Sequence, residues 1–100
     1  MIRGTTPTLE FVLPFDTETL AEAHVTLAQQ KKGVILTKEL ESCSCEGTKL
    51  TVKLTQAETL QLDCGCITEI QVRVRTKSGD ALASEIIKVN TERILEDGEI

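Results

Sequence analysis

Apolar and polar residues alternate along most of the chain, and a two-residue period of this kind predicts β-strands. The clearest segment is 49–55, where Leu50, Val52 and Leu54 fall on one face while lysine and threonine occupy the other. The expected strands are 8–13, 24–29, 34–40, 49–55, 67–76 and 81–89. No segment combines the length and the 3.6-residue period of a crossover helix, so a parallel α/β fold is not expected.

Turn and cap signals separate these strands. Glycine-containing turns are expected at 31–33, 46–47 and 77–80. Two short helical turns are also indicated. One lies within 16–22 and is capped by Asp16. The other covers 56–61, because Thr55 and Glu58 have the spacing of a capping box.

Short, half-polar strands with turn signals about every 8 to 12 residues are typical of an antiparallel sandwich. We therefore expect an all-β fold: an antiparallel β-sandwich, immunoglobulin-like, with about six or seven strands and one or two short helical turns. A chain of 100 residues has the size of one domain. We expect a single domain over 1–100, with 1–7 as a flexible arm and 96–100 as an acidic tail.

Composition narrows the classes of function. A net charge of −5 opposes binding to nucleic acid phosphates and to anionic membranes. Phe11 and Phe15 are the only aromatic residues, which argues against a stacking surface for carbohydrate or single-stranded nucleic acid. Residues 1–7 lack the apolar stretch of a secretory signal, and no apolar run reaches the roughly 20 residues of a membrane helix. An intracellular protein with reduced thiols is expected.

Four cysteines form two pairs with one intervening residue each: Cys43 and Cys45 in a short connection, and Cys64 and Cys66. In extended backbone, residues two apart point to the same face, so each pair could present two thiolates. If the two pairs lie side by side, they form a candidate tetrahedral zinc site. Two cross-strand disulfides are a second interpretation, and free thiols at strand ends are the third. One intervening residue is a weaker zinc signal than two or more.

Other chemically competent residues have simpler interpretations. His24 is the only histidine and is expected to face water, because Val25 and Leu27 face the core. Arg73 and Arg75 lie on the polar side of a strand with Glu69, where they can form cross-strand ion pairs or an interface rim. Solvated carboxylates, without the spacing of a calcium loop, are Glu39, Glu41, Glu46, Glu92, Glu96, Asp97 and Glu99. No nucleophile elbow and no phosphate-binding glycine loop is present.

Several segments resemble small uncharacterised proteins encoded among the structural genes of phages and prophages of Gram-positive (Firmicutes) bacteria. The segments that carry the resemblance are 1–8, 13–16, 54–59, 70–74 and 79–84. The layout is also similar, more loosely, to the sandwich domain at the start of some phage baseplate proteins. The resemblance implies a virion or assembly component and brings no site residues with it. Cys45 and Cys66 lie outside it.

The leading hypothesis is a non-enzymatic phage or prophage structural or assembly protein that binds other virion proteins, with self-association and incorporation into the particle as parts of that prediction. The alternative is a small zinc-binding module that uses Cys43, Cys45, Cys64 and Cys66. The main prediction includes no cofactor. A thiol redox or hydrolytic enzyme is the third hypothesis, and nothing around Cys64 and Cys66 indicates the lowered thiol pKa that it needs.

Overall fold

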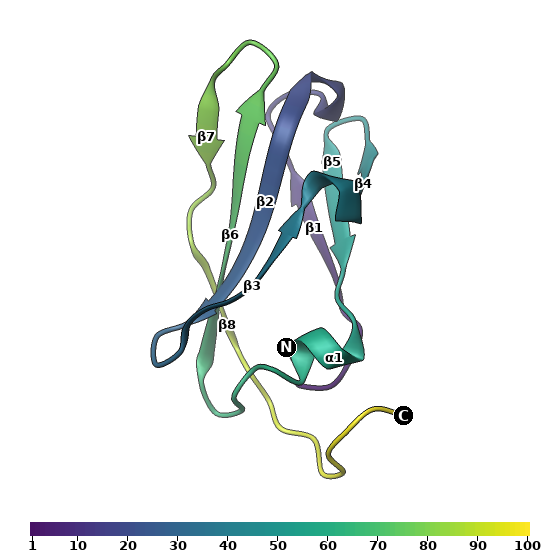
Figure 1. Ribbon diagram of the computed structural model, residues 1–100, viewed down its shortest axis with the longest axis vertical. Coiled ribbons are helices and arrows are strands. Elements are labelled where there is room, and N and C mark those ends of the chain that lie inside the picture. The colour runs from purple at the N-terminus through teal and green to yellow at the C-terminus, as the bar shows by residue number, and fades with distance from the viewer.

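The computed structural model describes residues 1–100 and contains two antiparallel sheets that face each other (Figure 1). The strands are β1 (Thr8–Val12), β2 (Leu20–Gln29), β3 (Gly33–Glu39), β4 (Cys43–Glu46), β5 (Lys49–Lys53), β6 (Ile67–Thr76), β7 (Ala81–Ala83) and β8 (Ile87–Asn90). Three short helical segments are η1 (Thr17–Thr19), η2 (Leu40–Ser42) and α1 (Gln56–Thr59). The expected all-β sandwich is confirmed, but it has eight strands where six or seven were expected, and three short helical segments where one or two were expected.

The connections follow an immunoglobulin-type sandwich. The smaller sheet has the order β1-β5-β4, and the larger has the order β3-β2-β6-β7, with β8 also paired to β6. β2–β3, β4–β5 and β6–β7 are antiparallel pairs of consecutive strands, while β1–β2, β3–β4 and β5–β6 cross between the sheets. In immunoglobulin terms these strands are B, C, C′, D, E, F and G, with β7 and β8 sharing the G position. No strand occupies the position of strand A, beside β1.

The core lies between the sheets and is made by the strand faces that the alternation predicted. Leu50 and Leu54 are completely buried, and Val52 beside them is 2% exposed. The opposing sheet contributes Ala23, Val25, Leu27, Ile70, Val72 and Val74. Burying one such side chain stabilises the fold by about 1.5–3 kcal/mol, so these positions hold the two sheets together.

The expected short connection around Cys43 and Cys45 was wrong, because this segment is β4. Its residues pair with β5 in a hairpin whose turn contains Gly47. Gly47 has a φ of 58°, which glycine adopts without the steric cost of a side chain. The sequence pattern missed the strand because 43–46 has only four residues, and so short an alternation does not distinguish an edge strand from a loop.

The expected single strand at 81–89 was also wrong, because 84–86 divides it into β7 and β8. Leu82 lies opposite Val74, and Ile87 lies opposite Ile70. Leu82 and Ile87 are five residues apart, but their partners Val74 and Ile70 are only four apart, so the β7–β8 edge contains one extra residue, a β-bulge. Because of the extra residue, even-numbered side chains face inward in β7 and odd-numbered ones face inward in β8.

Both predicted caps are present. Asp16 accepts a hydrogen bond from the backbone N–H of Glu18 at 2.9 Å and starts η1. The Thr55 hydroxyl accepts from the N–H of Glu58 at 3.1 Å, and the Glu58 carboxylate accepts from the N–H of Thr55 at 2.8 Å. This capping box starts α1, which ends at Thr59, two residues before the expected end.

Both termini lie at the α1 end of the molecule (Figure 1). The N–H of Glu92 donates to the carbonyl of Met1 at 2.7 Å, and the N–H of Arg3 donates to the carbonyl of Glu92 at 3.0 Å. Arg3 also donates to the carbonyl of Leu62 and forms an ion pair with Asp97. Residues 1–3 thus run beside the chain that leaves β8, and the use of 1–7 as an arm for a partner stays a prediction.

Candidate functional site

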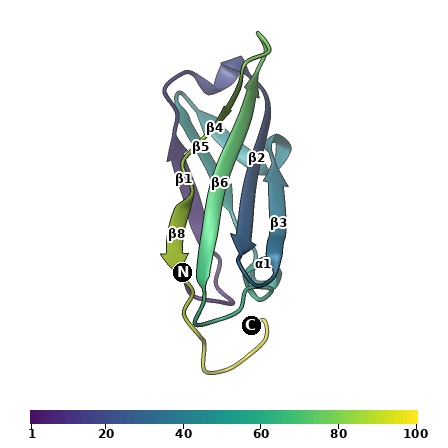
Figure 2. The same cartoon turned by 90° about the vertical axis from the view of Figure 1, so that its left-hand side faces the viewer.

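One side of the sandwich is formed by two strand edges that no chain segment joins. The smaller sheet ends there at β1 and the larger at the β7–β8 edge, and Figure 2 shows β1 and β8 along this side. We call the region between β1 and β7 the open side. The opposite region, between β3 and β4, is called the closed side.

Apolar side chains on the inner face of the β7–β8 edge are left uncovered. Leu82 pairs with Val74 and faces the same side of the sheet, yet Leu82 is 48% exposed while Val74 is 7% exposed. Ile87 pairs with Ile70 and shows the same contrast, 44% against 3%. Side chains that point between two sheets are normally buried, so these exposures mark a place where the opposing layer is missing.

An apolar cavity of about 270 Å³ opens at this place. Its walls are formed by 12–15 at the end of β1, by Val72 and Val74 of β6, and by 82–84 of the opposite edge. Seven of the nine lining residues are hydrophobic. The lining therefore suits apolar side chains inserted from outside.

The main chain of β1, which reaches this cavity at Val12, has hydrogen-bonding groups that β5 does not use. The carbonyl of Pro7 accepts from the N–H of Leu54 at 2.9 Å, and the N–H of Leu13 donates to the carbonyl of Thr48 at 2.8 Å. Odd-numbered residues therefore form the ladder with β5, because bonded and non-bonded positions alternate in an antiparallel pair. The N–H and C=O groups of Thr8, Glu10 and Val12 point away from β5, toward the unoccupied position of strand A beside β1.

The bulge opposite β1 is held in shape by Ser84. Its hydroxyl oxygen accepts from the N–H of Val72 at 3.1 Å, and its carbonyl accepts from the side-chain amide of Gln71 at 3.0 Å. The N–H of Ser84 donates to the carbonyl of Val72 at 2.9 Å. These bonds replace the regular ladder where it is interrupted, so the cavity wall is a defined structure.

One charged residue lies along the free edge of β1. Glu10 is on the solvent face and forms an ion pair with Lys49 of β5 at 3.0 Å. The hydrogen bond to Glu10 and its negative charge raise the pKa of Lys49. Both side chains are half exposed, so the pair contributes little to stability, but it holds the Glu10 carboxylate beside the free edge of β1.

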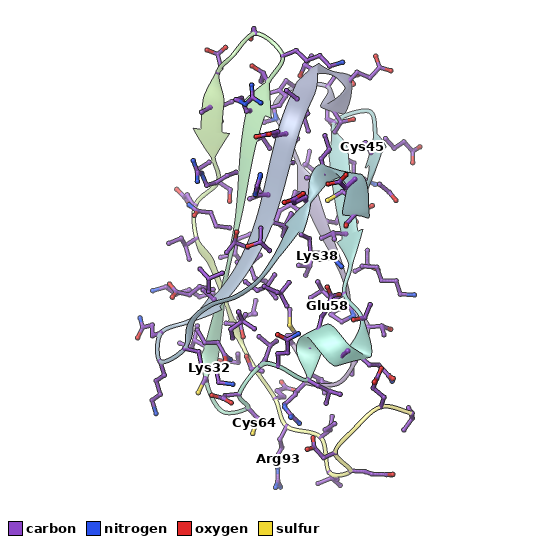
Figure 3. The ribbon with its side chains drawn as sticks, viewed as in Figure 1. Lys32, Lys38, Cys45, Glu58, Cys64 and Arg93 are labelled. Carbon is purple, nitrogen blue, oxygen red and sulfur yellow. The ribbon has the colours of Figure 1, made fainter.

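The four cysteines lie in two separate places. Cys43 and Cys45 are in β4, on the side that faces the core, and the thiol of Cys43 donates to the carbonyl of Glu39 at 3.4 Å. Figure 3 shows Cys45 and Cys64 toward opposite ends of the molecule. All four thiols are free, and no group of three or more metal-ligating side chains is present. The geometry brings together two pairs and not the four sulfurs of the zinc hypothesis.

The environments of the two pairs differ. Burial raises the pKa of the Cys43 thiol, the nearby Cys45 raises it further, and Lys38 opposes the shift. A raised pKa reduces the thiolate fraction, which makes Cys43 a weak nucleophile. Cys64 and Cys66 lie in a turn where Gly65 donates to the carbonyl of Thr91 at 2.8 Å. This turn anchors the start of β6 to the chain after β8.

The remaining candidates lie on solvated faces. His24 is half-buried on the outer face of β2, with Glu39 and Arg73 as its cross-strand neighbours. Arg75 forms a cross-strand ion pair with Glu22 at 3.5 Å, as the charge pattern predicted. The carboxylates Glu39, Glu41, Glu46, Glu92, Glu96, Asp97 and Glu99 are all exposed.

The open side was not anticipated from the sequence. The sequence contains two signals of it. The apolar positions change from even-numbered at Leu82 to odd-numbered at Ile87, and Val12 is an apolar residue on the polar side of an otherwise alternating strand. Val12 is 73% exposed. Either signal alone is common at a strand end, and only the fold places them across one cavity.

None of the helices has the length and apolar character needed to cross a membrane. Comparison of the chain with family models, with curated proteins and with solved structures gave no match in any of the three.

Proposed function

We propose that this protein is a non-catalytic phage or prophage component that acts in the particle or its assembly by binding other structural proteins. Two kinds of support exist. The sequence resemblance over most of the chain is to proteins encoded among phage structural genes. The surface carries an apolar cavity beside an unpaired strand edge, which is a feature of protein-binding domains.

The open side is the observation that carries the proposal. A single exposed apolar residue needs no explanation, but apolar side chains grouped around a cavity mark interaction sites. Leu82 and Val12 face that cavity from two different strands, and both are about half exposed or more. A partner that covers them removes apolar surface from water, and this favours association.

The test is the protein content of purified particles. Particles induced from the source strain are digested with trypsin and searched for the peptides 54–73 and 78–88, which end at Arg73 and Lys88. We expect both peptides in mature particles or in purified assembly intermediates, at a ratio to the other structural proteins that repeats between preparations. Their absence from both fractions, while the protein is detected free in the cell lysate, overturns the particle assignment.

Self-association is a separate part of the proposal. Native mass spectrometry of the purified protein, with and without reductant, gives the number of chains, any disulfide and any bound metal. A defined oligomer supports assembly from repeated copies, which symmetric particles require. One zinc per chain would instead favour the alternative, a zinc-binding module.

A further inference from the structure

We infer that the open side is an acceptor for a β-strand from another polypeptide, which adds to the free edge of β1 and covers the apolar inner face of β7. This inference deepens the proposed function and rests only on its protein-binding part. It does not depend on whether the partner belongs to a particle.

The first argument is that the open side meets two independent requirements of an added strand. The strand needs unpaired N–H and C=O groups in extended backbone, and Thr8, Glu10 and Val12 present them. It also needs a place for every second side chain, and the cavity beside Leu82 provides one. An ordinary sheet edge meets only the first requirement, and an ordinary surface pocket meets only the second.

The second argument is the fold itself. The strands present occupy positions B to G of the immunoglobulin-type order, and the vacant lane is that of strand A. A strand in this lane pairs with β1 and sends alternate side chains between the sheets. Exposed inner-face residues, 48% for Leu82 and 44% for Ile87, are the result expected when that strand is missing.

The charges select the occupant. Two copies of the chain joined through β1 in the central antiparallel register would place Glu10 directly opposite Glu10, and like charges in that position destabilise a sheet. The exposed ion pair of each Glu10 with its own Lys49 reduces this repulsion without removing it. A strand with lysine or arginine at the same position would instead face a carboxylate. The inferred partner is therefore an extended segment with apolar residues at alternate positions and a basic residue opposite Glu10.

A synthetic peptide tests this directly. The probe is Val-Thr-Val-Lys-Val-Thr-Val with blocked ends, titrated into the full chain labelled with ¹⁵N. We expect shifts and slowed amide exchange at Thr8, Glu10 and Val12, with further shifts around Leu82. The control peptide carries an N-methyl group on its central lysine, which removes the N–H that would bond to Glu10, and it should not bind.

Variants of the protein separate the strand edge from the cavity. Proline at position 10 removes an N–H that points into the lane and no ladder bond to β5, so Glu10→Pro should weaken peptide binding by about tenfold or more. Leu82→Ser should weaken binding by a smaller factor through the loss of apolar contact. Cys45→Pro is the matched control, because Cys45 has its N–H on the free edge of β4 in the same sheet. It should leave peptide binding unchanged.

Each outcome decides the inference. Binding at β1 that is lost in Glu10→Pro and kept in Cys45→Pro supports it, given unchanged far-UV circular dichroism for all variants. Binding equal in wild type and Glu10→Pro, peptide shifts at β3 or β4, or no binding up to about 1 mM overturns it. A peptide-free dimer with β1 amides protected also overturns it, in favour of a second copy. A failed peptide test leaves the particle test intact, and a particle result does not alter the peptide test.

Discussion

The two long sides of this sandwich are built differently. On the closed side, η2 carries the chain from β3 to β4, and Leu40 and Cys43 pack against the core. Lys38 of β3 also reaches Glu58 of α1 with an N–O distance of 2.7 Å, and both side chains are largely buried (Figure 3). On the open side, no chain segment connects β1 to β7, and apolar residues of both edges remain exposed.

The contrast shows how chain connectivity decides which edge of a sandwich is available. On the closed side, the segment that crosses from β3 to β4 lies over the gap between the sheets. The gap is therefore covered by the chain itself, and no second molecule is needed. On the open side, no strand of residues 1–100 pairs with the free edge of β1, and the gap stays uncovered. A closed side therefore contributes to the stability of the domain, and an open side leaves surface for binding.

The largest expected effect is in the shared core, which both sides require. Leu54 is completely buried, so Leu54→Ala should lower the free energy of unfolding by about 2–5 kcal/mol. Chemical denaturation with urea measures it. Leu95→Ala is the control, since Leu95 is 92% exposed and its loss should change stability by less than about 0.5 kcal/mol. Equal effects at the two positions would contradict the assignment of the core.

A matched pair of leucines compares the two sides directly. Leu36 of β3 pairs with Leu27 and packs against the core, whereas Leu82 of β7 is 48% exposed. Leu36→Ala should cost about 1–3 kcal/mol and Leu82→Ala less than about 1 kcal/mol, because only buried area contributes. The same urea experiment measures both. A larger loss for Leu82 would mean that the open side is covered in the isolated protein.

The strand faces could be predicted from the sequence because alternation depends only on local geometry. Leu50, Val52 and Leu54 face the core as their spacing indicates, and the capping box at Thr55 forms as its residue types require. β4 could not be predicted, because a short edge strand is defined by its pairing with β5 and not by its own pattern. Local sequence patterns thus identify strands that have one apolar face packed in the core, but not short strands whose existence depends on pairing with a neighbour.

The open side escaped prediction for a related reason. A vacant lane is a property of strand order, and no residue encodes it locally. The bulge between Leu82 and Ile87 changes which side chains face inward, and this becomes visible only in the register with β6. The cysteines depend on the fold in the same way: the spacing within each pair is local, but strand order decides whether the two pairs meet, and Cys45 and Cys64 lie toward opposite ends of the molecule (Figure 3).

The contact between Lys38 and Glu58 predicts a smaller, pH-dependent effect on the closed side. Burial opposes ionisation of Glu58, but hydrogen bonds from Lys38 and Thr55 outweigh it, so the pKa of Glu58 lies below its ordinary value. Glu58→Ala should cost about 1 kcal/mol at pH 7, because it removes the capping box and leaves Lys38 without its partner. Glu58→Gln keeps a hydrogen-bond acceptor for the cap and should cost less.

The sign of the pH dependence follows from the lowered pKa. Stability from ionised Glu58 is complete above the pKa of the unfolded chain, about 4.3, and is lost as the pH falls through the lower folded value. The difference in urea midpoint between wild type and Glu58→Gln should therefore be constant from about pH 6 to 7 and shrink toward pH 3. A difference that grows on acidification would contradict the ion pair.

The smallest effect concerns two neighbouring carboxylates on the closed side. A hydrogen bond with Glu39 and its negative charge raise the pKa of Glu41. Because the pKa of Glu41 is raised, the protonated Glu41 stabilises the fold, and this contribution is lost as the pH rises through that pKa. At pH 7 both carboxylates are ionised and repel each other. Glu41→Gln should slightly raise the melting temperature at pH 7 and give no gain at pH 3.

Glu46→Gln is the opposite control, because Glu46 lies across from Lys49 and its charge favours the protonated lysine. If both substitutions shift the melting temperature in the same direction, general relief of the net negative charge explains them better than these two local pairs.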